Sequence, residues 1–183
     1  MIDFPLIKTF HVNSRVISFL NRKYEEYRLL NQLRPAENEI YMSDTGLFTD
    51  NLLEWEDREY QKFAKNKLVT MVSKQLRIDK KQFSMYWTHI FDYQKGGYVR
   101  EHKHDDVEDY VMLLYLNKCS SGETIFYLNN YDEEAKNRTT IRVMPLPNRG
   151  VCFSSQVMHK VSYTQEPKRI LAAGIKINVK QGL

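Results

Sequence analysis

Apolar residues in the first half of the chain recur at the spacing of amphipathic helices. A first helix is predicted to begin at Asn13 or Ser14, either of which can cap it. A second, longer helix is predicted to open at Asp50 or Asn51. The apolar positions that define the buried face of each helix are, in turn, Ile17, Leu20, Tyr24 and Tyr27, and Tyr60, Phe63, Ala64, Leu68, Met71, Val72 and Leu76.

The segments around these helices carry weaker signals. A strand-like opening covers residues 4–7, and residues 31–50 contain Pro35 and Gly46, which are typical of a loop. One short strand is predicted inside this loop, around residues 40–42. Residues 1–82 are therefore predicted to form a helical support region.

From Phe83 onward, short segments rich in β-branched and aromatic residues alternate with turn residues such as Gly96-Gly97 and Ser121-Gly122. Helices followed by many strands predict one α+β domain, mainly β, over residues 1–183, with a sandwich or barrel core over residues 83–180. The predicted strands cover residues 83–93, 98–104, 111–116, 124–128, 139–144, 151–154 and 170–179.

Composition and charge argue against several classes of protein. The formal net charge is +4 and the basic residues are scattered, so nucleic-acid binding is not expected. The two cysteines, Cys119 and Cys152, form neither a disulfide framework nor a zinc motif, which favours a cytoplasmic protein. The longest apolar run, 111–116, is far shorter than the roughly 20 residues that span a bilayer, so no membrane segment is expected.

Candidate chemistry begins with the histidines. An extended strand would place His102, His104 and Asp106 on one face, because side chains two positions apart point the same way. Two histidines and one carboxylate, with open positions, are the donor set of non-haem Fe(II) sites. His104 and Asp106 would supply an H-x-D pair, and His159 is the candidate for the distant third ligand. His11 and the remaining histidine, His89, are interpreted as structural.

Charged residues near these histidines are candidates for ligand binding. Arg169 follows His159 by ten residues, and a guanidinium can pair with a carboxylate through two hydrogen bonds. Four acidic residues close to the candidate metal ligands form a second charged group, an acidic run, namely Asp105, Asp106, Glu108 and Asp109. If these residues line the entrance to the metal site, they would attract a cationic group of the substrate.

Several segments between Tyr93 and Arg169, taken in their order and spacing, resemble the 2-oxoglutarate- and Fe(II)-dependent oxygenases. Within this family they resemble the prolyl-hydroxylase-like branch with its phage and bacterial members. The resemblance implies a double-stranded β-helix, a jelly-roll-like core, braced by the N-terminal helices. It also implies that Arg169 grips the far carboxylate of 2-oxoglutarate, with Tyr93 and Tyr115 lining the same pocket. The stretches that carry it are Tyr93 to Gly97 leading into His102, Leu114 to Asn117, Ser121 to Phe126, Pro147 to Phe153, His159 and Arg169.

The resemblance leaves two metal-ligand sets open. The spacing from Tyr93 points to His102 as the leading histidine, and His104 then stands where the family has an aspartate. Either the H-x-D pair is slipped to His104 and Asp106, or the pair is an H-x-H form made by His102 and His104. In both cases His159 is the third ligand, so three of the four residues His102, His104, Asp106 and His159 are expected to hold the metal, and Asp106 influences the charge of the site.

The resemblance implies a dioxygenase that uses Fe(II), 2-oxoglutarate and O2. It would hydroxylate a C–H bond of a peptide side chain, prolyl-type, or of an amino acid, with decarboxylation of 2-oxoglutarate to succinate. The expected partners are peptide, protein or amino-acid substrates, and the phage members suggest a phage-encoded protein acting in the host cytoplasm. One alternative is a cupin-type metal-binding β-sandwich that does not use 2-oxoglutarate, and another is a non-enzymatic binding module that uses its tyrosines for contact.

Overall fold

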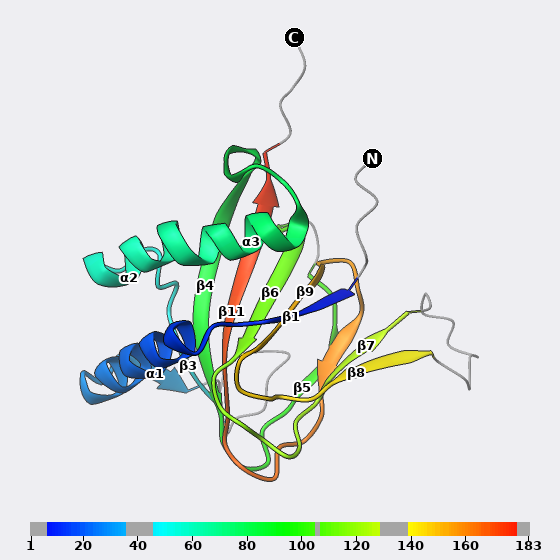
Figure 1. The fold of residues 1–183 in the computed structure, drawn as a ribbon. Coiled ribbons are helices and arrows are strands. Elements are labelled where there is room, and N and C mark those ends of the chain that lie inside the picture. The colour runs from blue at the N-terminus through cyan, green and yellow to red at the C-terminus, as the bar shows by residue number, and fades with distance from the viewer. Residues whose placement is uncertain (1–6, 36–45, 105–106, 129–138, 179–183) are drawn as a thin grey trace.

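Two antiparallel sheets form the body of the protein (Figure 1). The computed structural model describes residues 7–35, 46–104, 107–128 and 139–178. In the described residues, the larger sheet has seven strands in the order β1-β9-β6-β11-β4-β3-β2, and the smaller has four in the order β5-β10-β7-β8. The strands are β1 (Ile7–His11), β2 (Leu33–Pro35), β3 (Gly46–Thr49), β4 (Phe83–Tyr93), β5 (Val99–His102), β6 (Tyr110–Tyr115), β7 (Thr124–Tyr127), β8 (Thr140–Val143), β9 (Arg149–Ser154), β10 (His159–Val161) and β11 (Lys168–Ile177).

The helices pack on one face of the larger sheet. Helix α1 (Ser14–Leu29) is capped by the Asn13 side chain, and α2 (Arg58–Phe63) is capped by Asp57. A π-helical turn (Ala64–Leu68) joins α2 to α3 (Val69–Leu76), and a short 3₁₀ turn (Lys80–Gln82) leads into β4. None of the described helices has both the length and the apolar composition needed to cross a membrane.

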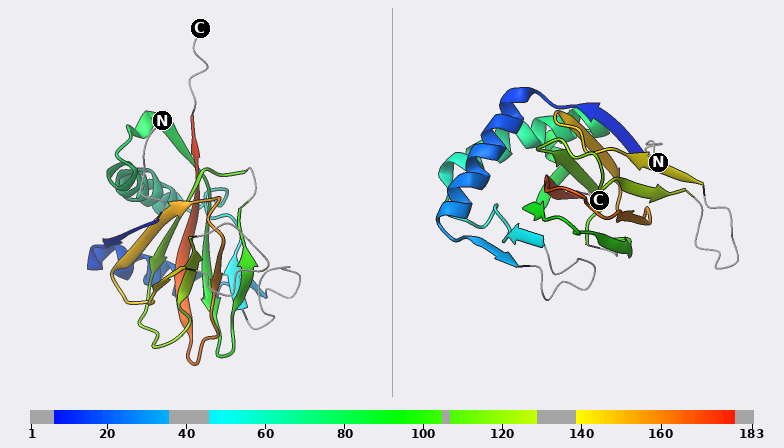
Figure 2. Two further views of the ribbon diagram at one scale, coloured as in Figure 1. Left: turned by 90° about the vertical axis from the view of Figure 1, so that its right-hand side faces the viewer. Right: turned by 90° about the horizontal axis from the view of Figure 1, so that it is seen from below.

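The central strands are buried on both faces, because the larger sheet separates two apolar layers. On β6, Met112 and Leu114 pack toward the helices, whereas Val111, Leu113 and Tyr115 pack toward the smaller sheet. Figure 2 shows the helices and the smaller sheet on opposite sides of the larger one. A strand with two buried faces is a near-continuous apolar run, as the sequence of β6 is.

The mainly β fold class, with helices bracing a double-stranded β-helix, is confirmed. The first helix begins where Asn13 predicts it, but the second begins at Arg58, later than the expected start at residue 50 or 51. The short strands β2 and β3 were not predicted, nor was β10, and β1 lies later than the expected opening strand. The strand expected around residues 40–42 falls outside the described residues.

Candidate metal centre and ligand pocket

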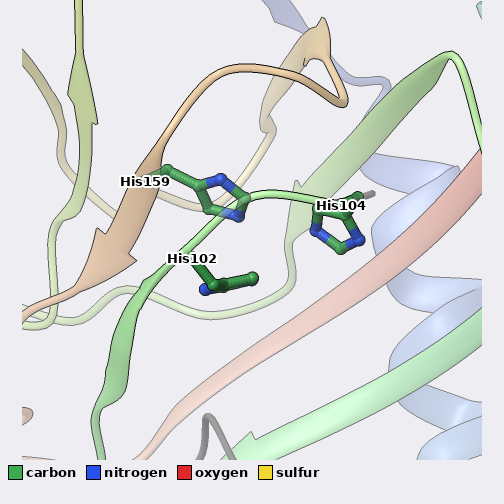
Figure 3. A group of neighbouring side chains, drawn as sticks. All are labelled: His102, His104 and His159. Atoms are coloured by element: carbon green, nitrogen blue, oxygen red, sulfur yellow. The ribbon is translucent and has the colours of Figure 1, made fainter. Parts of the chain in front are cut away.

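Three histidines converge between the two sheets (Figure 3). His102 ends β5 and His159 begins β10, and the two are directly paired in the register of these strands. His104 lies two residues beyond β5, where its backbone N–H donates to the carbonyl of Ser155 at 3.0 Å. One ring nitrogen from each histidine lies within 4.8 Å of the others, which is the spacing of groups that can share a metal ion.

Hydrogen bonds fix the orientation of each imidazole. The Nδ1 atom of His102 lies 2.9 Å from the carbonyl oxygen of Arg100, and Nδ1 of His159 lies 2.9 Å from that of Val157. A carbonyl can only accept, so both Nδ1 atoms carry the proton and both Nε2 atoms are unprotonated. This is the arrangement of metal-binding histidines, in which a partner on one nitrogen aims the other at the metal.

His104 has a charged partner instead of a carbonyl. Its Nδ1 atom lies 2.7 Å from Oε1 of Glu108, and the Glu108 residue is only 4% exposed. The carboxylate also accepts a hydrogen bond from the Trp87 side chain. Burial alone raises the pKa of Glu108, but the hydrogen bonds from His104 and Trp87 outweigh it and leave the pKa below its ordinary value.

The electrostatic environment favours neutral imidazoles. Burial, together with the nearby His102, holds the pKa of His159 well below its usual value. Burial also lowers the pKa of His102, and His104 adds to this effect. Because a metal ion binds the unprotonated ring nitrogen, these two histidines are in the form that binds metal at neutral pH.

A cavity of about 370 Å³ opens beside the histidines. Its wall is mostly apolar, and all three imidazoles line it. An apolar pocket with a few convergent polar groups is the usual form of a small-molecule site. Apolar lining residues include Trp87, Phe91, Val111, Leu113, Ile170 and Ala172.

A buried lysine lies next to this cavity. Lys168 is 0% exposed, on the face of β11 that Ile170 and Ala172 share and turn toward the smaller sheet. Its Nζ donates to the carbonyl of Gly122 at 2.7 Å, and it lies 5.3 Å from the ring centre of Tyr93 and 5.6 Å from that of Tyr115. Among the described residues no carboxylate forms an ion pair with this amine, and burial lowers the pKa of Lys168 to about 7.

Arg169 lies on the opposite face of β11, toward α1. Its guanidinium carbon lies 3.4 Å from the ring centre of Tyr24, and NH1 donates to Asn21 at 3.2 Å. Its Nε lies 4.0 Å from Oδ1 of Asp92, which accepts a hydrogen bond from the Tyr24 hydroxyl through its other oxygen. The structure therefore places Arg169 away from the cavity, unlike the sequence-based expectation, because successive residues of a strand point to opposite faces.

The remaining predicted site residues are placed as follows. Tyr93 lines the cavity, and the buried Tyr115 hydroxyl donates to Thr124 at 2.8 Å. Asp106 lies outside the described residues, as does Asp105. Asp109 accepts from the backbone N–H of Ile177 at 2.7 Å, so this member of the acidic run makes an internal contact. Sequence reasoning did not assign a role at the site to Lys168, nor the contact with His104 to Glu108.

The histidines assigned a structural role take no part in the three-histidine cluster. His11 lies on β1, and Nδ1 of His89 lies 2.8 Å from the carbonyl oxygen of Thr49. The His89 ring also lies among the aromatic rings of β4, 5.3 Å from Trp87 and 5.8 Å from Phe91.

Neither a protein-family model nor a curated protein matches this sequence. A solved prolyl-4-hydroxylase from Pseudomonas putida matches with a TM-score of 0.67 and 18% identity, over 93% of this chain and 92% of that one. The viral collagen prolyl hydroxylase of Paramecium bursaria Chlorella virus-1, solved with 2-oxoglutarate, matches with a TM-score of 0.63 and 13% identity, over 96% of this chain and 98% of that one. A Trichoplax adhaerens prolyl hydroxylase, in complex with a hypoxia inducible factor peptide, matches with a TM-score of 0.69 and 12% identity, over 96% of this chain and 84% of that one. These matches confirm, at the level of the fold, the resemblance to 2-oxoglutarate-dependent oxygenases.

Proposed function

We propose that this protein is a 2-oxoglutarate- and Fe(II)-dependent dioxygenase that hydroxylates a C–H bond of a peptide side chain, prolyl-type, or of an amino acid. The observation that carries the proposal is the combination of three histidines that line one apolar cavity and a buried lysine, Lys168, that lies behind the cavity-lining residue Tyr93 without a carboxylate partner among the described residues. The fold shared with three prolyl hydroxylases supports it. A cupin-type site without 2-oxoglutarate is not favoured, because it gives the buried lysine no role.

His102, His104 and His159 would hold the metal through their Nε2 atoms. Three neutral nitrogen donors on one side of an ion suit Fe(II) and leave positions for other ligands. When bound, Fe(II) supplies the redox chemistry that converts 2-oxoglutarate, O2 and R–H into succinate, CO2 and R–OH. The protein itself supplies the donor atoms, their fixed orientation and an apolar surrounding that excludes water.

Lys168 would bind the far carboxylate of 2-oxoglutarate. Its amine has three donor hydrogens, and the described residues engage them with one carbonyl, that of Gly122. A carboxylate arriving next to this amine would neutralise a charge that is otherwise buried without a counter-ion. Tyr93 and Tyr115 flank the amine and would restrict where the carboxylate lies. Arg169, which was first expected in this role, holds α1 instead.

The cavity and the cysteines bear on substrate and compartment. Because the wall around the histidines is apolar, it would accept an aliphatic side chain such as that of proline better than a charged one. One of the similar prolyl hydroxylases was solved with a peptide, which supports a peptide substrate. Cys119 and Cys152 are both buried free thiols, as expected for action in a reducing cytoplasm, including that of a phage host.

The test is turnover with a panel of proline-containing peptides and free amino acids, in the presence of Fe(II), 2-oxoglutarate and O2. The expected result is a product that has gained one oxygen atom by mass spectrometry, with succinate formed in equal amount. Formation should stop when 2-oxoglutarate is omitted, and at limiting 2-oxoglutarate it should be strongly reduced in the Lys168→Met variant. Product formation that continues without 2-oxoglutarate would support the cupin-type alternative.

A further inference from the structure

The three-histidine set lacks the negative charge that a carboxylate ligand brings. With a two-histidine, one-carboxylate set, one ligand neutralises part of the metal charge. Three neutral imidazoles leave that charge to other groups, and among the residues that the structure describes the outer partners of the ligands are a source of it. Among the described residues, the carboxylate that contacts a cluster histidine is that of Glu108.

Glu108 contacts two side chains, those of His104 and of Trp87 on β4, which hold its carboxylate in place. Its carboxylate accepts from Nδ1 of His104 and from the Trp87 side chain, and the indole N–H is the donor that Trp offers. The Trp87 and His104 rings are near-parallel, with centres 6.2 Å apart and planes 24° apart. The buried carboxylate thus accepts from two donors, and a carboxylate held in this way can orient the His104 ring.

Gly174 makes room for this arrangement. It pairs with Trp87 across β11 and β4, at a point where the register of the two strands shifts. A Cβ atom at Gly174 would lie 2.3 Å from the indole Nε1 of Trp87, a distance that no side chain tolerates. The absence of a side chain at Gly174 therefore leaves room over β11 for the indole that interacts with Glu108.

We propose that Glu108 is a positioning residue of the metal site: it orients His104 and supplies, through its hydrogen bond to this histidine, negative charge that the three histidines lack. The inference rests on the proposed function, because it assumes that the three histidines bind Fe(II). It assigns the role of a ligand carboxylate to a residue outside the ligand set. Trp87 and Gly174 act through Glu108, by fixing its carboxylate.

The test compares two variants that remove the same charge from adjacent positions. Glu108→Gln keeps the shape of the side chain, whereas Asp109→Asn is the matched control, since Asp109 contacts Ile177 and Lys176 rather than the histidines. The Fe(II) dissociation constant is measured anaerobically by competition with a coloured chelator. Loss of a partner of this kind is expected to weaken metal binding by about 10- to 100-fold in Glu108→Gln, with Asp109→Asn unchanged.

A second readout separates electrostatics from general damage to the fold. With Fe(II) and 2-oxoglutarate both saturating, the charge-transfer band of Glu108→Gln should move to shorter wavelength, because an iron centre with less negative charge nearby gives up electron density less readily. The band of Asp109→Asn should stay in place. A band that does not move in Glu108→Gln would overturn the electrostatic part of the inference.

A double-mutant cycle with His104→Asp gives the sharpest outcome. That substitution places a carboxylate in the ligand set and removes the imidazole that Glu108 orients, so adding Glu108→Gln should weaken Fe(II) binding far less than it does in the wild type. If Glu108→Gln does not fold, Trp87→Phe replaces it, because it removes the N–H donor and keeps an aromatic ring. Wild-type affinity in Glu108→Gln would overturn the inference and leave the proposed function standing, whereas a wild-type protein without Fe(II) affinity would overturn both.

Discussion

Lys168 and Arg169 are neighbours in β11, yet the Lys168 amine lies between the sheets beside Tyr93 while the Arg169 guanidinium lies over the ring of Tyr24 on α1. The two cations therefore have different roles. Lys168 donates to the carbonyl of Gly122 and is the proposed partner of the 2-oxoglutarate carboxylate, whereas Arg169 joins the first helix to the sheet.

Replacing Lys168 should weaken 2-oxoglutarate binding far more than replacing Arg169. Lys168→Met keeps the length of the side chain and removes a charged hydrogen-bond donor, a loss of about 1.5–3 kcal/mol, or roughly 10- to 150-fold in affinity. Arg169→Ala should bind 2-oxoglutarate as the wild type does. Anaerobic titration of the Fe(II) protein with 2-oxoglutarate measures both. The opposite pattern, with binding lost in Arg169→Ala and kept in Lys168→Met, would restore the arginine to the ligand site.

Arg169→Ala should instead lower the stability of the fold. Asp92 is 5% exposed, and the substitution leaves its carboxylate without the nearby cation. Breaking a buried charge pair in this way is expected to lower the free energy of unfolding by about 3 kcal/mol. Urea denaturation measures it. Arg28→Ala is the control, because Arg28 is an exposed α1 residue whose ion pair with Glu25 lies on the surface, and no change is expected there.

The stability of the ligand-free protein should depend on pH through Lys168. Burial lowers the pKa of Lys168 to about 7, below the ordinary 10.5 that applies in the unfolded chain. Between these values the unfolded chain binds a proton that the folded protein does not, so stability rises with pH by about 1.4 kcal/mol per unit. Below about pH 7 the Lys168 amine is protonated in both states, so the full cost of burying its charge lowers the stability of the folded protein. The difference in unfolding free energy between wild type and Lys168→Met, measured from pH 6 to 10, should follow this slope, and a difference independent of pH would contradict it.

A side chain at Gly174 should disturb the metal site from a distance. The Cβ atom of Gly174→Ala would overlap the Trp87 indole, so the ring must shift and its hydrogen bond to Glu108 must break. Overpacking of this kind lowers stability by about 1–3 kcal/mol. Thermal melting should show the loss, and Fe(II) affinity should fall in the same direction as in Glu108→Gln. Unchanged affinity in a folded Gly174→Ala would mean that the indole does not fix the carboxylate.

The sequence predicted the fold class and singled out the three histidines that the structure brings together. Turn residues and β-rich segments after Phe83 predicted the sheets, and the spacing of His102 and His104 ahead of His159 predicted their convergence. The sequence pattern could not tell which of the two neighbouring cations, Lys168 or Arg169, faces the smaller sheet. Because β11 is buried on both faces, its two sets of alternating residues are both apolar, and alternation does not tell which face a cation occupies.

Two other features depend on side-chain placement and strand pairing that local sequence patterns do not specify. The contact between the Glu108 carboxylate and His104 depends on how the two side chains are placed in the folded protein, and Trp87 and Gly174 come together through strand pairing across more than eighty residues of sequence. The later start of α2 reflects its Asp57 cap, which accepts from the N–H of Tyr60 and competes with the weaker signals at residues 50 and 51. Neither cap choice nor strand register is fixed by local pattern alone.

The most direct test of the central claim is an anaerobic spectrum of the metal-free protein after addition of Fe(II) and then 2-oxoglutarate, with His159→Ala measured beside it. We predict a visible charge-transfer band in the wild type that appears only when both components are present and is absent in His159→Ala. Tight Fe(II) binding with no band at saturating 2-oxoglutarate would contradict the account and show that the three histidines hold a metal for a different reaction.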